Sequence, residues 1–145
     1  MPRPPIVKET CLDVSDLARA TRFYRNLFGF EVIESGERFC ALSVAGQHVL
    51  ILFLRGASSG PIRTPGGKIP PHGTTGTSHV GFGIAKNQIA TWERSLREHG
   101  IAIESKVTWP LGGQSIYFRD PDAHLLELLT PGVWRTKGSC HLTST

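Results

Sequence analysis

The chain carries one pattern twice, first as Lys8-Glu9-Thr10-Cys11-Leu12-Asp13-Val14 and again as Ser78-His79-Val80-Gly81-Phe82-Gly83-Ile84. Each copy indicates a strand, and each runs into a stretch with helical spacing. A repeat of this kind indicates one supersecondary unit used twice. Glu9 and His79 hold the same place in the two copies, and both side chains can bind a metal ion. If the copies pair about a pseudo-two-fold axis, the repeat predicts a metal site at these two residues.

The first copy is predicted to contain a strand, a helix and three further strands. Alternation of polar and apolar residues predicts a strand over 7–14. Ser15 or Asp16 can cap the following helix, and Gly29 is expected to end it. The three remaining strands are predicted at 30–34, 39–44 and 49–54.

The second copy repeats this order. It is predicted to have a strand at 77–84, a helix capped by Asn87 and closed by Gly100, and strands at 101–105, 115–119 and 124–129. We therefore expect one α+β domain, 1–145, built from two paired βαβββ modules whose curved mixed sheets surround a cleft. Its parts are module 1 at about 6–54, a Gly/Pro-rich linker at 55–76, module 2 at about 77–131 and a mobile tail at 132–145.

The last predicted strand places a carboxylate among leucines. By the period-two rule Glu127 shares a face with Leu125 and Leu129, and the corresponding positions of the first copy are Val49, Ile51 and Phe53. A buried carboxylate is costly unless it is paired or coordinates an ion. A metal ion shared by Glu9, His79 and Glu127 would remove that cost.

Composition and charge exclude several classes of protein. The chain has 145 residues, a formal net charge of +4 and no apolar run long enough to span a membrane. Arg19, Arg22 and Arg25 fall on one face of the first helix, which indicates a solvated face rather than a nucleic-acid site. The N-terminus lacks an apolar signal segment, and the three cysteines form no CxxC motif. We therefore expect a cytoplasmic protein with reduced thiols and with no nucleic-acid or membrane partner.

Three stretches resemble the vicinal oxygen chelate superfamily, which includes glyoxalases, bleomycin-resistance proteins and extradiol dioxygenases. They are residues 9–17 with Phe23-Tyr24, Leu27 and Gly29-Phe30, residues 78–82, and the run 117–128, Tyr-Phe-Arg-Asp-Pro-Asp-Ala-His-Leu-Leu-Glu-Leu. The resemblance covers about residues 6–131. It implies paired βαβββ modules enclosing a divalent cation, with the family's ligand positions on Glu9, His79 and Glu127. It also implies a homodimer.

Two departures from the family's patterns narrow the chemistry. Ring-cleaving dioxygenases of the superfamily have a His where this chain has Glu9, and glyoxalases have a fourth ligand on the strand that is wholly apolar here, 49–54. The resemblance thus implies three protein ligands and one ion, which is Mn, Ni, Co, Zn, Mg or Fe. Glu9 or Glu127 is then the catalytic group, taking a proton next to a polarised carbonyl.

The resemblance favours a metal-dependent, glyoxalase-like enzyme of the lyase or isomerase type that acts on a small substrate chelated through vicinal oxygens. The alternatives are an extradiol-type dioxygenase, a thiol transferase like the fosfomycin-resistance enzymes, and a non-catalytic drug-binding protein like the bleomycin-resistance proteins. Residues expected to contact the substrate are His72, Phe53, Trp109, Tyr117 and Arg119. A surface loop is the commoner place for a histidine such as His72, and the first expectation for Arg119 is that it holds the turn before the last strand. His48 and His124 are expected to be structural.

Overall fold

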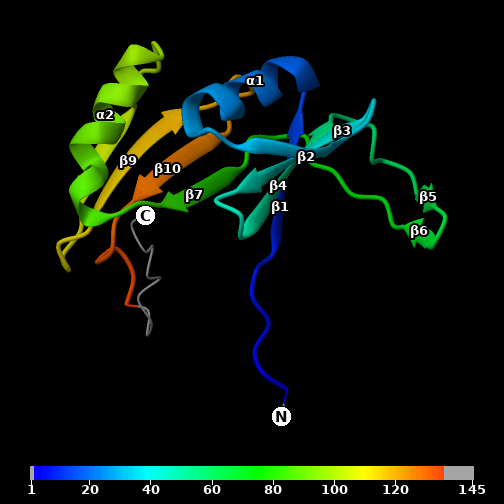
Figure 1. Cartoon of the computed structure of the whole chain (residues 1–145), viewed down its shortest axis with the longest axis horizontal. Helices are drawn as coiled ribbons and strands as arrows, with labels where there is room; N and C mark the ends of the chain where they lie inside the picture. Colours follow the sequence, from blue (N-terminus) through cyan, green and yellow to red (C-terminus); the bar gives the residue numbers. More distant parts are fainter. Residues whose placement is uncertain (1, 136–145) are drawn as a thin grey trace. The chain divides into compact units, whose positions relative to one another are not determined.

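The structure is a computed structural model that describes residues 2–135, and the chain divides into two compact units, the first ending at Thr77 and the second beginning at Ser78. Each unit contains a four-stranded mixed sheet and an α-helix in the order βαβββ, which confirms the predicted α+β fold (Figure 1). Unit 1 consists of β1 (Glu9–Val14), α1 (Leu17–Phe28), β2 (Glu31–Ser35), β3 (Phe39–Val44), β4 (His48–Leu54), β5 (Ile62–Thr64) and β6 (Gly67–Ile69).

The sheet of unit 1 has the strand order β1-β4-β3-β2, with β1 parallel to β4 and the other pairs antiparallel. Glu9 lies opposite Val49, and Asp13 lies opposite Phe53. The alternate residues of β1, β3 and β4 form the core of the unit, with at most 1% of their surface exposed: Leu12, Val14, Leu42, Leu50 and Leu52. Alternation therefore separates a buried apolar face from the face that carries Glu9.

Helix α1 begins and ends where its sequence predicts. Asp16 is the N-cap, and its carboxylate accepts a hydrogen bond from the Arg19 N–H at 3.0 Å. Gly29 ends the helix with a φ of 72°, a left-handed conformation that glycine adopts at low cost. The buried side chains of the helix, Ala20, Tyr24 and Leu27, recur at the spacing of one helix face.

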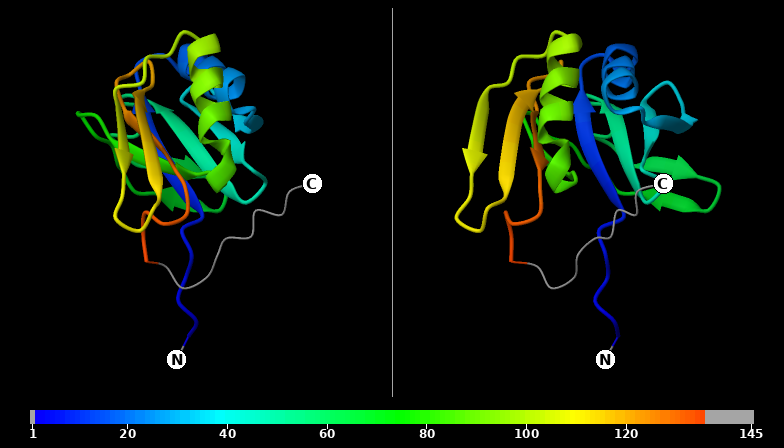
Figure 2. Two further views of the ribbon diagram at one scale, coloured as in Figure 1. Left: turned by 90° about the vertical axis from the view of Figure 1, so that its left-hand side faces the viewer. Right: turned by 60° about the vertical axis from the view of Figure 1, so that its left-hand side comes forward.

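Unit 2 repeats this topology. Its elements are β7 (His79–Gly83), the short helix η1 (Lys86–Gln88), α2 (Ile89–Glu98), β8 (Ser105–Thr108), β9 (Gln114–Arg119) and β10 (Leu125–Leu129). The sheet order is β7-β10-β9-β8, and Figure 2 shows β8, β9 and β10 side by side in both views. His79 lies opposite Leu125 as Glu9 lies opposite Val49, so Glu127 holds the register position that Ile51 holds in unit 1.

Two predicted details of secondary structure were wrong. Asn87 does not cap α2: it lies within η1, and Gln88 Oε1 accepts the hydrogen bond from the Ala85 N–H. No strand covers 101–104, because Ile101 donates its N–H back to Leu96 O at 2.9 Å and thus belongs to the helix end; the strand, β8, begins only at Ser105. The 55–76 connection contains the small hairpin β5–β6, which projects from the sheet of unit 1 (Figures 1 and 2).

Neither end of the chain adds to the two sheets within the described residues. Residues 2–8 carry no helix or strand, and most of the predicted tail, 136–145, lies outside the residues that the structure describes. Within the described residues, no helix is both long and apolar enough to cross a membrane.

Candidate functional site

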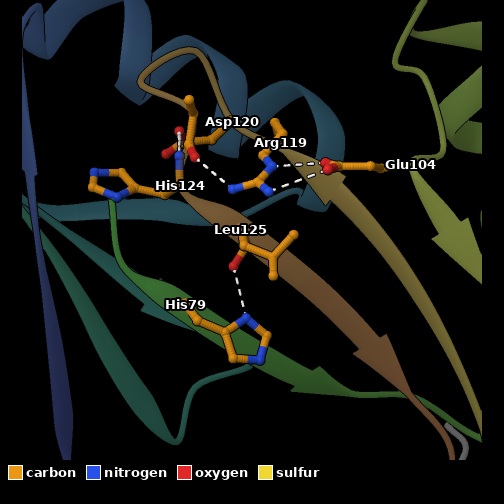
Figure 3. A network of polar contacts seen from close by, with 7 residues as sticks. His79, Glu104, Arg119, Asp120, His124 and Leu125 are labelled. Atoms are coloured by element: carbon orange, nitrogen blue, oxygen red, sulfur yellow. Dashed lines mark hydrogen bonds and ion pairs between the residues drawn. The ribbon is translucent and has the colours of Figure 1, made fainter. Parts of the chain in front are cut away.

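His79 is held in one orientation by the backbone of the neighbouring strand. Its Nδ1 lies 3.0 Å from the carbonyl oxygen of Leu125 (Figure 3). A carbonyl oxygen can only accept, so Nδ1 carries the proton and donates it. In the neutral ring, Nε2 then presents a lone pair. A backbone acceptor behind an imidazole is the arrangement that orients metal-binding histidines.

Glu127 faces this lone pair from the centre of the same sheet. Its Oε1 lies 3.1 Å from His79 Nε2, and its side chain is buried while His79 is half exposed. The other oxygen, Oε2, accepts a hydrogen bond from the Ser115 hydroxyl at 2.7 Å. Two acceptor atoms therefore meet at the open edge of the site, and an arrangement of this kind requires a shared proton or a cation.

The distance between these two atoms fits a pair of ligands to one metal ion. Ligand atoms about 2.1 Å from a common ion lie roughly 3.0–3.4 Å apart at octahedral or tetrahedral angles. The separation between His79 Nε2 and Glu127 Oε1, 3.1 Å, lies in this range. Imidazole nitrogen with carboxylate oxygen is also a donor set that suits Zn, Mn, Fe, Co and Ni. The pair thus fits the divalent ion that the sequence predicts.

Tyr117 lies beside this pair. Its ring is 6.2 Å from the His79 ring, centroid to centroid, and in the sheet it lies directly opposite Glu127. Desolvation and the nearby Glu127 carboxylate raise the pKa of the Tyr117 phenol, while its contact with Ser115 acts in the opposite sense. The phenol consequently stays protonated at neutral pH and is available as a hydrogen-bond donor.

Glu9, the third predicted ligand, belongs to unit 1. It is exposed at the start of β1, on the same face as Cys11 and Asp13. Partial burial, followed by the charges of Glu9 and Asp13, raises the pKa of the Cys11 thiol, which is therefore not an activated nucleophile. Among the described residues no group of three His, Cys, Asp or Glu side chains gathers as a complete metal site. A shared site with Glu9 therefore remains a prediction.

Unit 1 also brings together two of the predicted substrate contacts. The His72 ring packs edge-on against Phe53, with 4.6 Å between ring centroids. His72 lines an open hollow of about 450 Å³ together with Asp13 and Thr74. Asp13 is buried, and its Oδ2 accepts a hydrogen bond from the Thr74 N–H at 2.6 Å. The 55–76 connection is thereby fastened to the end of β1.

Arg119 and its neighbours build the turn before β10 (Figure 3). The Arg119 guanidinium donates to both carboxylate oxygens of Glu104, at 2.7 and 3.2 Å, and to the carbonyl of Ala123 at 3.0 Å. Asp120 Oδ1 accepts hydrogen bonds from the backbone N–H groups of Asp122 and His124, both at 2.9 Å. Substrate binding by Arg119 stays a prediction, since these contacts serve the turn.

His124 is structural, as its sequence position predicts. Its side chain is fully buried, and Nδ1 accepts a hydrogen bond from the Ser78 N–H at 2.9 Å. This bond fixes the residue immediately before His79. The turn before β10 thereby orients the strand that carries the candidate ligand.

The structure brings together four of the residues predicted for the site: His79, Glu127, Tyr117 and Trp109. Ser115, which joins Trp109 to Glu127, was not among the predicted residues. The Trp109 indole N–H donates to Ser115 Oγ at 2.8 Å, and Ser115 donates in turn to Glu127. Strand periodicity does place Ser115 on the face of Tyr117, two residues away. That signal was available in the sequence, whereas the register of β9 against β10 was not.

The fold and the site define a class of protein: repeated βαβββ units with an imidazole and a carboxylate on the adjacent strands β7 and β10. The profile of the Glyoxalase/Bleomycin resistance protein/Dioxygenase superfamily matches residues 6–128. The chain belongs to this superfamily.

Individual relatives differ in their named activities. Metallothiol transferase FosB of Shouchella clausii (strain KSM-K16) is 27% identical over 126 residues, which cover 86% of this chain and 79% of the relative. Catechol-2,3-dioxygenase of Bacillus subtilis (strain 168) is 26% identical over 81% of this chain, but the match spans only 38% of that protein. The crystal structure of lactoylglutathione lyase from Agrobacterium tumefaciens superimposes with a TM-score of 0.83 at 30% identity, covering 92% of this chain and 98% of that one.

Proposed function

We propose that this protein is a metal-dependent, glyoxalase-like enzyme of the lyase or isomerase type, acting on a small substrate with vicinal oxygens. The observation that carries the proposal is the pair His79 Nε2 and Glu127 Oε1, two acceptor atoms 3.1 Å apart, with the imidazole fixed from behind by the Leu125 carbonyl. Two acceptor atoms this close require a shared proton or a cation between them, and a bound divalent ion would meet that requirement. The likeness to a lactoylglutathione lyase supports the reaction class.

His79 and Glu127 would hold one divalent ion, with Glu9 as the third ligand. When bound, such an ion polarises a substrate carbonyl and makes the adjacent C–H more acidic. With three protein ligands, the remaining coordination positions stay open to substrate oxygens.

Of the two carboxylates, Glu9 is the better base. Glu127 is buried and is held through both oxygens, by Ser115 and beside His79. Glu9 is exposed at the start of β1. A general base has to come within hydrogen-bond distance of the substrate proton, so we assign proton removal to the exposed Glu9 and anchoring of the ion to the buried Glu127.

The remaining predicted contacts would shape the substrate pocket. Tyr117, a protonated phenol beside Glu127, is suited to donate a hydrogen bond to a substrate oxygen. Trp109, Phe53 and His72 would supply the apolar and aromatic walls of the pocket. Arg119 would bind an anionic group of the substrate if its guanidinium leaves Glu104. Assembly as a homodimer in the cytoplasm belongs to the same proposal.

A second candidate is thiol transfer to an epoxide. The curated relatives include several metallothiol transferases at 25–29% identity, each matched over at least 81% of this chain. The same three ligands would serve this reaction. The two candidates differ in the co-substrate, because the lyase acts on a thiol adduct already formed whereas the transferase joins thiol and epoxide.

Metal analysis with matched variants tests the proposal. The protein is purified without chelator, and its metal content is measured beside Glu127→Ala and the exposed helix variant Glu98→Ala. About one divalent ion per chain in the wild type and in Glu98→Ala, lost in Glu127→Ala, is expected. Lactoylglutathione lyase and fosfomycin thiol transfer assays with that ion then separate the two reactions. Absence of metal in all three proteins, with no uptake on reconstitution, would leave the drug-binding alternative.

A further inference from the structure

A chain of hydrogen bonds runs from the turn between β8 and β9 to the candidate ligand Glu127. The Trp109 indole Nε1–H donates to Ser115 Oγ at 2.8 Å, and the Ser115 hydroxyl donates to Glu127 Oε2 at 2.7 Å. The indole can only donate and the carboxylate can only accept, so the direction of both bonds is fixed. Ser115 is 1% exposed, and water therefore does not compete for its hydroxyl.

The turn that carries Trp109 is itself fastened in place. The Trp109 N–H donates to Gly113 O at 2.8 Å, and the Gly112 N–H donates to Trp109 O at 2.9 Å. Gly113 packs its backbone directly against Gly132, beyond the end of β10, leaving no room for a side chain. The indole is thus presented to Ser115 by a closed turn rather than by a free loop.

We infer that Ser115 and Trp109 are positioning residues for Glu127. Their chain of donors occupies Oε2, so the carboxylate cannot rotate and Oε1 stays directed at the lone pair of His79 Nε2. The inference rests on the proposed function, since the edge made by Oε1 and Nε2 is the proposed ion-binding edge. Outer-shell partners of this kind act through the ligand and contact neither the ion nor the substrate.

The test compares Ser115→Ala and Trp109→Phe with two matched controls from unit 2, Ser105→Ala on β8 and Trp92→Phe on α2. Chelator-treated proteins are first compared by long-range ¹H–¹⁵N spectra of the His79 ring. Zn²⁺ affinity is then measured by calorimetry with a competing chelator. Far-UV circular dichroism and a cooperative urea transition establish that each variant is folded, and Ser115→Thr restores the hydroxyl.

We expect the affinity of Ser115→Ala for Zn²⁺ to fall by about 10- to 100-fold, the usual effect of losing an outer-shell partner. Trp109 is one hydrogen bond further from the ligand, so the Zn²⁺ affinity of Trp109→Phe is expected to fall less. The affinities of both controls are expected to stay at the wild-type value. In the metal-free spectra, the His79 Nε2 resonance should shift in Ser115→Ala but not in Ser105→Ala.

The two proposals fail in different ways. If wild-type protein binds neither Zn²⁺ nor any of the other candidate ions, Mn, Ni, Co, Mg and Fe, but the His79 resonance still responds to Ser115→Ala, the proposed function is wrong and the positioning role stands. If Ser115→Ala binds Zn²⁺ like the wild type, or leaves the His79 resonance unchanged, the positioning role is refuted whatever the activity. Recovery of both readouts in Ser115→Thr would assign the effect to the hydroxyl.

Discussion

The buried carboxylate of Glu127 should make the metal-free protein less stable than an apolar replacement would. Transfer of a carboxylate out of water costs several kcal/mol, and a hydrogen bond such as that from Ser115 returns about 1.5–3 kcal/mol of it. The equivalent position in unit 1 is filled by Ile51, so the fold accommodates an aliphatic side chain there.

The variant has to remove both partners. Glu127→Leu alone leaves the buried Ser115 hydroxyl without its acceptor, at a cost of about 1–3 kcal/mol. The double variant Glu127→Leu/Ser115→Ala removes that penalty as well. It and the wild-type reference are both measured in a Trp109→Phe background, because Ser115→Ala would otherwise leave the indole N–H without its acceptor. By analogy with other buried ionic groups replaced by apolar residues, we expect the double variant to be about 1–3 kcal/mol more stable than the wild type in chelator. For a chain of this length that is roughly 3–10 °C in Tm.

Urea unfolding followed by circular dichroism, with and without Zn²⁺, measures this difference. At a free ion concentration 100 times its Kd, the wild type should gain about 2.7 kcal/mol, and the double variant nothing. The difference in the free energy of unfolding between the double variant and the wild type should therefore shrink to zero or change sign when the ion is added. The surface variant Glu98→Leu provides the control and should stay within about 0.5 kcal/mol of the wild type in both conditions.

A double variant that unfolds more easily than the wild type in chelator, by about 1 kcal/mol or more, would refute this reasoning. It would mean that Glu127 stabilises the fold by itself, and a structural role would then explain its burial. The double variant could instead be more stable than the wild type while the wild type gains no stability from Zn²⁺. That result would support the desolvation cost of Glu127 and contradict metal binding at this site.

Three further predictions concern unit 2. Gly113→Ala should lower the free energy of unfolding by at least about 2 kcal/mol, measured in urea, because its Cβ would overlap the backbone of Gly132. Asp120→Ala should cost about 1–3 kcal/mol in the same assay, since two backbone N–H groups of the turn lose their acceptor; an unchanged midpoint would contradict the assigned turn. The hydrogen bond from Arg119 lowers the pKa of Glu104, so this pair stabilises the fold above the ordinary pKa of Glu and the effect is lost as the pH falls through the lowered value. NMR titration should find the Glu104 pKa below its usual range, and back near it in Arg119→Gln.

Local signals in the sequence were sufficient for much of the fold. Asp16 and Gly29 bound α1 because capping involves only neighbouring residues. The repeat predicted that Glu9 and His79 occupy equivalent register positions, as they do in the two sheets. Alternation among leucines predicted the burial of Glu127. The strand expected at 101–105 begins only at Ser105, because Ile101 donates its N–H to Leu96 O at the end of α2, a contact that strand propensity ignores.

The sequence by itself determined the repeat, the strand faces and the residue types that can bind a metal ion, because these depend on period-two alternation and on side-chain chemistry. Only the tertiary structure decided how two of those residues are held. The Leu125 carbonyl that fixes the His79 ring and the Ser115 hydroxyl that fixes Glu127 come from neighbouring strands. Their contacts depend on inter-strand register, which is set by packing and turn geometry across many residues and which no local pattern encodes.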